Sequence, residues 1–261
     1  MVETAVALAA GLLVGSFLNV CIHRMPRDES VVRPRSRCPH CRHRIGWYDN
    51  LPLASWLALG GRCRHCRGAI AVRYVMVELA TAALVVWAVL RWGPTLEAGK
   101  FALFAAMQLA LVFSDLETRI LPDQFTIGGA VLGLATAAVV PMRGGLAELL
   151  PGATLTVFGS VMEAAIAAAV ASGSLWLVGR LYQRFRRREG LGLGDVKMVA
   201  MIGAFLGLPE ALLTLILGSV AGSVGGLIYI KLTRQDASTY ELPFGSFLGV
   251  AALAVAFLGR G

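Results

Sequence analysis

Two aspartates lie where long apolar runs of this chain meet polar segments. Asp115 directly follows the apolar run 105–113, and Asp195 opens another apolar run after the glycine-rich segment 190–194. A carboxylate at a membrane boundary is costly and usually has a function. Two neighbouring carboxylates that share one proton can activate a water molecule and protonate a leaving amine. The sequence therefore predicts that Asp195 acts with an acid of the earlier cluster to hydrolyse a peptide bond. That cluster offers Asp115, Glu117, which is most simply a solvated loop charge, and Asp123.

Residues near these aspartates have more than one interpretation. Asp123 opens the next helix, where it is either an accessory to the pair or a cap for the free N–H groups of that helix. Asp195 could itself be only a helix cap, favoured by the helix dipole. Gly192 and Gly194 leave the backbone bare before Asp195, so another segment can approach closely. Lys197 either extends its ammonium to the membrane boundary or tunes Asp195.

Four of the five cysteines form two Cys-x-x-Cys pairs, separated by 21 residues: Cys38, Cys41, Cys63 and Cys66. This spacing lets two tight turns converge on one tetrahedral zinc ion. The alternative is that the cysteines are reduced and unligated. His40, His43 and His65 could substitute as ligands, but four cysteines suffice, and surface positions in an Arg-rich loop explain the histidines. We expect the metal to be structural, because so small an insert has little core of its own.

The composition argues against an ordinary soluble domain. Hydrophobic residues make up 57% of the chain and charged residues 15%, with a mean hydropathy of +0.69, whereas soluble domains carry about 25% charged residues. Eight apolar segments are predicted to be membrane helices, at about 4–22, 74–91, 99–114, 124–140, 158–180, 195–207, 210–230 and 244–258. We therefore predict an all-α polytopic membrane protein with a first transmembrane helix (1–22), a zinc-ribbon-like insert (23–73) and a transmembrane peptidase domain (74–261).

Positive charge is divided unevenly between the two predicted faces of the membrane. Of the 24 Lys and Arg residues, 20 fall on the face that carries the insert, and 4 fall on the opposite face. Cytoplasmic loops carry such an excess of basic residues. The bias places the insert, Asp115, Asp123 and Asp195 on the cytoplasmic side and both termini outside. Because this pattern accounts for the net charge of +8, no nucleic-acid partner is expected.

The segment Gly192-Leu193-Gly194-Asp195 resembles the Gly-x-Gly-Asp motif of intramembrane aspartyl proteases. Over nearly its whole length, the chain is similar to the type IV prepilin peptidases, which are also leader peptidase/N-methyltransferases. The similarity covers residues 15–20 with Arg24 and Pro26, the four-cysteine insert, Asp115, and residues 121–123, 194–197 and 243–245. Met198 stands where the family often has leucine, which is a mild departure.

This resemblance implies that Asp115 and Asp195 are the catalytic pair of an aspartic endopeptidase. It implies prepilin or pseudopilin substrates of type IV pilus and type II secretion systems. These are cut after a glycine at the cytoplasmic face of the bacterial inner membrane. It also implies N-methylation of the new N-terminus with S-adenosylmethionine, for which no binding residue is assigned. The individual substrate and the oligomeric state are not predicted.

Three alternatives remain. A transporter with a zinc-ribbon regulatory loop would use membrane carboxylates to bind cations or protons, but such acids belong near the midplane at broken helices. A membrane-tethered nucleic-acid-binding ribbon would use the eleven arginines of the insert. Within the favoured interpretation, a peptidase that lacks methyl transfer is the alternative.

Overall fold

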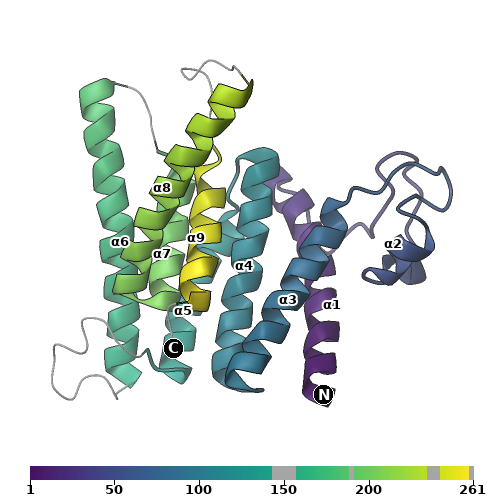
Figure 1. Ribbon diagram of the computed structural model, residues 1–261, viewed down its shortest axis with the longest axis horizontal. Coiled ribbons are helices and arrows are strands. Elements are labelled where there is room, and N and C mark those ends of the chain that lie inside the picture. The colour runs from purple at the N-terminus through teal and green to yellow at the C-terminus, as the bar shows by residue number, and fades with distance from the viewer. Residues whose placement is uncertain (143–156, 188–190, 234–241, 259–261) are drawn as a thin grey trace. The chain divides into compact units, whose positions relative to one another are not determined.

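The computed structural model describes residues 1–142, 157–187, 191–233 and 242–258 of the chain (Figure 1). These residues contain helices, two isolated β-bridges and no strand. The α-helices are α1 (Val2–Arg24), α2 (Ala54–Ala58), α3 (Arg73–Trp92), α4 (Leu96–Thr118), α5 (Asp123–Val139), α6 (Val157–Arg186), α7 (Leu193–Leu206), α8 (Leu208–Thr233) and α9 (Phe244–Leu258). The predicted all-α fold is confirmed, and each predicted apolar segment corresponds to one of the helices α1 and α3–α9.

Five of the described helices are long and apolar enough to cross a membrane, namely α1, α3, α4, α6 and α8. The apolar helices α5 and α9 are shorter. At a rise of about 1.5 Å per residue, the 14 residues of α7 extend about 21 Å, less than the roughly 30 Å of a bilayer core. By length and composition alone, five of the eight apolar helices in the described residues could each cross a membrane.

Some helices end at other residues than predicted, and local residues explain where α7 ends and α8 begins. Helix α6 continues past the predicted end at 180 to Arg186. Gly207, with φ +96°, ends α7, and Pro209 lies in the first turn of α8, where its missing N–H costs nothing. Residues 141–157, between the predicted segments 124–140 and 158–180, fall largely outside the described residues, as does Gly190 of the glycine-rich segment.

The chain divides into two compact units, Met1–Ala110 and Leu111–Gly261. In the first unit, α1 packs against α3 through small residues. A Cβ on Gly11 would lie 2.5 Å from the Cα of Ala82, and a Cβ on Gly15 would lie 2.7 Å from the Cα of Glu78. The absence of side chains at these glycines lets the two backbones approach closely. The four-cysteine insert lies between α1 and α3 in the sequence.

Helix α7 is the central element of the second unit, since it packs against α5, α6, α8 and α9. Most of its residues from Met198 to Phe205 are buried. A Cβ on Gly203 would lie 2.7 Å from the backbone of Ala167 in α6, so a side chain there would separate the two helices. Helix α8 packs on α9 in the same way, and a Cβ on Gly218 would lie 2.8 Å from the side chain of Leu248. The short helix α7 is thus shielded by its neighbours.

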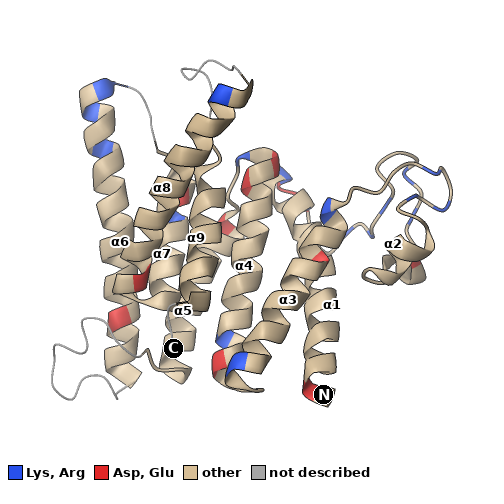
Figure 2. Ribbon diagram, viewed as in Figure 1, with Lys and Arg blue, Asp and Glu red and all other residues tan. Residues whose placement is uncertain are grey.

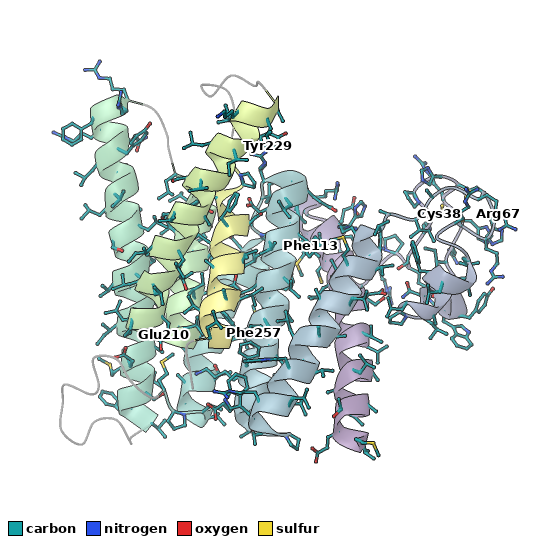
Figure 3. All side chains as sticks on the ribbon, viewed as in Figure 1. Cys38, Arg67, Phe113, Glu210, Tyr229 and Phe257 are labelled. Atoms are coloured by element: carbon teal, nitrogen blue, oxygen red, sulfur yellow. The ribbon has the colours of Figure 1, made fainter. Side chains whose placement is uncertain are left out.

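Charge in the second unit collects at helix ends (Figure 2). The last turn of α6 contains Arg184 and Arg186, and the last turn of α8 contains Lys231. Both of these ends lie on the same side of the unit (Figure 2). Glu210 lies in the first turn of α8, toward its opposite end from Tyr229 (Figure 3). Basic residues therefore mark one side of this helical unit.

Candidate functional site

A tight connection between α4 and α5 presents Asp115. Arg119 adopts φ +58° and ends the helix, while the hydroxyl of Ser114 donates a 2.7 Å hydrogen bond to the carbonyl of Ile120. Pro122 then precedes the first residue of α5. The chain consequently reverses within a few residues of Asp115, whose side chain is only 5% exposed.

The carboxylate of Asp115 is held by the start of α9. The backbone N–H of Ser246 donates to Oδ2 of Asp115 over 2.7 Å, and the hydroxyl of Ser246 lies 2.8 Å from the same oxygen. Ser246 is the third residue of α9, where backbone N–H groups have no partner within the helix. The helix dipole also favours a negative charge at this position. Asp115 is thus fixed by an element 131 residues further along the chain.

Asp195 is the third residue of α7, and its carboxylate turns back toward the residue that precedes the helix. The N–H of Gly192 lies against this carboxylate, an arrangement similar to a capping box. The carboxylates of Asp195 and Asp115 are close enough for the charge on one to act on the other. The capping interpretation and the pairing interpretation are therefore compatible for Asp195.

Leu121 joins the surroundings of the two aspartates. Its side chain packs against Gly194, where an added Cβ would lie 3.2 Å from the Cβ of Leu121. It also packs against Gly245, where a Cβ would lie 3.0 Å from the Cδ1 of Leu121 and 3.2 Å from the Cγ of Asp115. The predicted close approach to Gly194 is confirmed, and Leu121 is the residue that makes it. At Gly192 an added Cβ would meet Oδ2 of Asp195 itself, at 3.2 Å.

Asp123 and Lys197 form an ion pair with each other. Nζ of Lys197 lies 2.7 and 3.0 Å from the two carboxylate oxygens of Asp123. Pro122 precedes α5 as its cap residue, and no side-chain hydrogen bond caps that helix, so the capping interpretation of Asp123 is wrong. The ammonium of Lys197 lies on Asp123, and this contact connects α5 to α7.

Ser246 is the one residue of this constellation that sequence reasoning missed. The segment 243–245 was singled out by resemblance, but no role was given to the serine that follows it. The available signal was its position, since a hydroxyl residue in the first turn of a helix is suited to bind an oxygen or an anion. Only the folded chain reveals that the anion is Asp115.

The four-cysteine insert forms two turns of the same design. In the first, the N–H of Cys38 binds the carbonyl of His43, and Arg42 adopts φ +57°. In the second, the N–H of Cys63 binds the carbonyl of Gly68, and Arg67 adopts φ +57°. Cys38 lies inside the folded insert and Arg67 at its outer edge (Figure 3). This repeated turn brings the two cysteine pairs together, as the spacing predicts.

The geometry of the cysteines fits a metal ion. The Sγ atoms of Cys38, Cys41, Cys63 and Cys66 all lie within 4.8 Å of one another, and none is in a disulfide. Sγ of Cys38 lies 3.8 Å from Sγ of Cys66, which matches the roughly 3.8 Å edge of a tetrahedron with zinc–sulfur bonds of about 2.3 Å. Backbone N–H groups of Cys66 and His65 lower the pKa of Cys63 to about 6, which favours the thiolate that metals bind. The N–H of Gly68 lowers the pKa of Cys66, but burial and the neighbouring thiols outweigh it and raise that pKa to about 11. His43 and His65 stack on each other, with ring centroids 3.5 Å apart.

A buried carboxylate links the insert to the helices of the first unit. Glu78 in α3 is 7% exposed and accepts a 2.9 Å hydrogen bond from the N–H of Leu53 in the insert. The hydroxyl of Ser16 in α1 binds the same carboxylate. Nearby, the side-chain amide of Asn19 donates to the carbonyl of Tyr74 over 3.0 Å. Glu78 therefore ties three segments of this unit together.

Comparison with known proteins gives a consistent result over most of the chain. The family described as "Bacterial Peptidase A24 N-terminal domain" matches residues 9–92, and the "Type IV leader peptidase family" matches residues 102–227. No solved structure matches the chain.

Several curated relatives carry the name "Prepilin leader peptidase/N-methyltransferase". A protein of Myxococcus xanthus (strain DK1622) is 40% identical over 88% of this chain and 64% of its own length. A protein of Stutzerimonas stutzeri is 36% identical over 94% of this chain and 87% of its own length. One of Pseudomonas aeruginosa is 35% identical over 92% of this chain and 85% of its own length.

Proposed function

Because this chain belongs to the type IV leader peptidase family, we propose that it removes the leader from prepilins and pseudopilins at the inner membrane. We propose Asp115 and Asp195 as the catalytic pair. The observation that carries this proposal is that two carboxylates 80 positions apart in the sequence lie within electrostatic reach of each other. Asp195 lies in the first turn of α7, and Asp115 is held by the start of α9. A transporter is not favoured, since the names of this chain's relatives describe a peptidase.

The chemistry requires one carboxylate as base and one as acid. The base takes a proton from the water that attacks the scissile carbonyl, and the acid protonates the oxygen of that carbonyl. Two carboxyls that lie close together cannot easily both be ionised, so one shared proton is the expected resting state. The surroundings of the two residues differ in a way that supports this division, since Asp115 is buried near the end of α4 and Asp195 is partly buried in the first turn of α7.

The substrate class follows from the family and from the position of the pair. Prepilins and pseudopilins carry a basic leader, then a glycine and a membrane helix. A cut at the cytoplasmic boundary would suit aspartates at helix ends. The excess of Lys and Arg on the side that carries the insert supports a cytoplasmic position for the insert, Asp115 and Asp195, with both termini outside.

We propose that the four cysteines hold a structural zinc ion and that residues 23–73 form a separate insert between the first helix (1–22) and the peptidase domain (74–261). The close approach of the four sulfur atoms supports this assignment. The second activity, methylation of the new N-terminus, would take its methyl group from S-adenosylmethionine, as the names of the relatives imply a methyl donor.

The test is to incubate the purified protein in lipid with a prepilin, with and without S-adenosylmethionine, and to measure the mass of the product. Loss of the leader in both samples, and one further methyl group only with S-adenosylmethionine, are the expected results. An intact prepilin would overturn the peptidase, whereas leader loss with no methyl group would leave the peptidase and remove the transferase.

A further inference from the structure

Ser246 offers Asp115 two hydrogen-bond donors from a single residue. The backbone N–H lies 2.7 Å, and the hydroxyl 2.8 Å, from the same oxygen, Oδ2. A backbone N–H can only donate, so this oxygen must accept. Hydrogen bonds donated to a carboxylate favour its ionised form, and they are stronger than bonds between neutral groups.

Asp195 has a different environment. The N–H of Gly192 is the donor that faces its carboxylate, and the charge of Asp115 lies nearby. A negative charge on Asp115 favours a proton on Asp195, because two like charges at close range repel. The two members of the pair are therefore not equivalent.

We propose that Ser246 is a positioning residue that keeps Asp115 ionised as the general base, so that Asp195 carries the shared proton as the general acid. This inference rests on the proposed function, since it divides the work between the two proposed catalytic residues. It assigns Ser246 no contact with the substrate.

The reaction balances under this assignment. The water oxygen bonds to the scissile carbonyl carbon while one water proton passes to Asp115, and the proton of Asp195 passes to the carbonyl oxygen. The C–N bond then breaks, Asp115 gives its proton to the leaving amine, and Asp195 regains a proton from a hydroxyl of the intermediate. Both carboxyls return to their starting states, and no other reactant is consumed.

The hydroxyl of Ser246 can serve Asp115 in both of its states. It has a single hydrogen and two acceptors in reach, Oδ2 of Asp115 at 2.8 Å and the carbonyl of Val112 at 3.1 Å. While Asp115 is ionised, the hydroxyl donates to Oδ2. When Asp115 takes the water proton and loses its charge, the hydroxyl can turn its hydrogen to the carbonyl of Val112.

Other charged side chains at these ends of α4, α5 and α7 do not take this role. Arg119, one turn further on, carries a positive charge near Asp115. Glu117 lies on the exposed end of α4, and Lys197 of α7 is paired with Asp123 of α5. Helix α9 has no titratable side chain over its length. Ser246, unlike these charged residues, is a neutral donor to Asp115, so removing its hydroxyl does not change the net charge of the site.

The test is the pH profile of kcat/KM for leader cleavage by Ser246→Ala and Ser246→Thr in the full chain in lipid. Alanine keeps the N–H but removes the hydroxyl, so the ionised form of Asp115 loses a donor and becomes less favourable. The acidic limb of the profile, where Asp115 becomes protonated, should therefore move up by about one pH unit. Threonine keeps the hydroxyl and should restore the wild-type limb. The matched control is Ser172→Ala, which removes a hydroxyl that bonds only to carbonyls of its own helix α6 and should leave the limb in place.

An unchanged limb in Ser246→Ala, with activity reduced equally at every pH, would make Ser246 merely structural and overturn the inference. If Ser246→Thr displaced the acidic limb as far as Ser246→Ala does, that result would also overturn the inference. Asp115→Asn and Asp195→Asn are assayed in the same experiment. If both are inactive while Ser246→Ala keeps its limb, only this inference fails. If either cleaves normally, the proposed function fails.

Discussion

Lys197 in α7 forms an ion pair with Asp123 at the start of α5, with Nζ 2.7 and 3.0 Å from the two carboxylate oxygens. The contact spans 74 positions of sequence and ends two residues from Asp195. It occupies the ammonium and the carboxylate that the sequence offered as accessories to the catalytic pair. We propose that the two residues support the position of α7 rather than take part in the chemistry.

Neutralising this ion pair should have a small effect. The side chains of Lys197 and Asp123 are 38% and 57% exposed, and exposed ion pairs contribute about 0–1 kcal/mol. We expect Asp123→Asn and Lys197→Gln each to lower the apparent melting temperature slightly and cleavage by less than about tenfold, with no further loss in the double variant. Complete loss of cleavage in Asp123→Asn, with the protein still folded, would give Asp123 a chemical role.

A methyl group at Gly245 should disable the site without unfolding the chain. The new Cβ would lie 3.2 Å from Oδ2 of Asp115 and 3.0 Å from Leu121, so the carboxylate must shift. Because small displacements of reacting groups are costly, we expect Gly245→Ala to lower kcat by about tenfold to a hundredfold.

The control for that substitution is Gly128→Ala in α5, where an added Cβ meets nothing within 4 Å. Alanine in a helix is favoured over glycine by about 0.5–1 kcal/mol, so this variant should be at least as stable as the wild type and fully active. Equal activity of the two alanine variants would show that the close contact at Gly245 does not position Asp115.

The cysteine cluster should bind one zinc ion per chain. We expect elemental analysis to find zinc in the wild type and in Cys21→Ala, because Cys21 is buried in α1 and lies outside the cluster. Cys63→Ser should lose the metal, and limited proteolysis should then cut the insert sooner, since its small core depends on the ion. Retention of a full complement of zinc in Cys63→Ser would contradict the assignment of these ligands.

Glu78 should matter as a hydrogen-bond acceptor. Glu78→Ala leaves the N–H of Leu53 without its partner, at a cost of about 1–3 kcal/mol. Glu78→Gln keeps an acceptor oxygen and should be close to the wild type. Thermal melting and proteolysis of the insert distinguish the two variants. If glutamine were as harmful as alanine, the charge of Glu78 and not its hydrogen bond would be the important feature.

The helices and the metal cluster could be predicted because their signals are local. Apolar runs mark the helices, and the fixed Cys-x-x-Cys spacing brings pairs of sulfur atoms together. The cluster depends on only one long-range event, the meeting of two turns that repeat the same hydrogen bonds around Cys38 and Cys63.

The candidate active site could be predicted only in part. Asp115 and Asp195 were recognisable because carboxylates at apolar boundaries are unusual. The Lys197–Asp123 pair and the bond from Ser246 to Asp115 were not, because each joins segments that are distant in sequence. The capping interpretation of Asp123 used a local rule, and a tertiary ion pair prevailed over it.

The central claim is tested most directly by the mass of a prepilin after incubation with the wild type, Asp115→Asn and Asp195→Asn in the same lipid. Asparagine keeps the size of the side chain and removes its ability to ionise, and melting curves verify that each variant is folded. We predict that the wild type removes the leader and that both variants leave the full-length mass unchanged. Leader removal at the wild-type rate by either folded variant would contradict the aspartate pair.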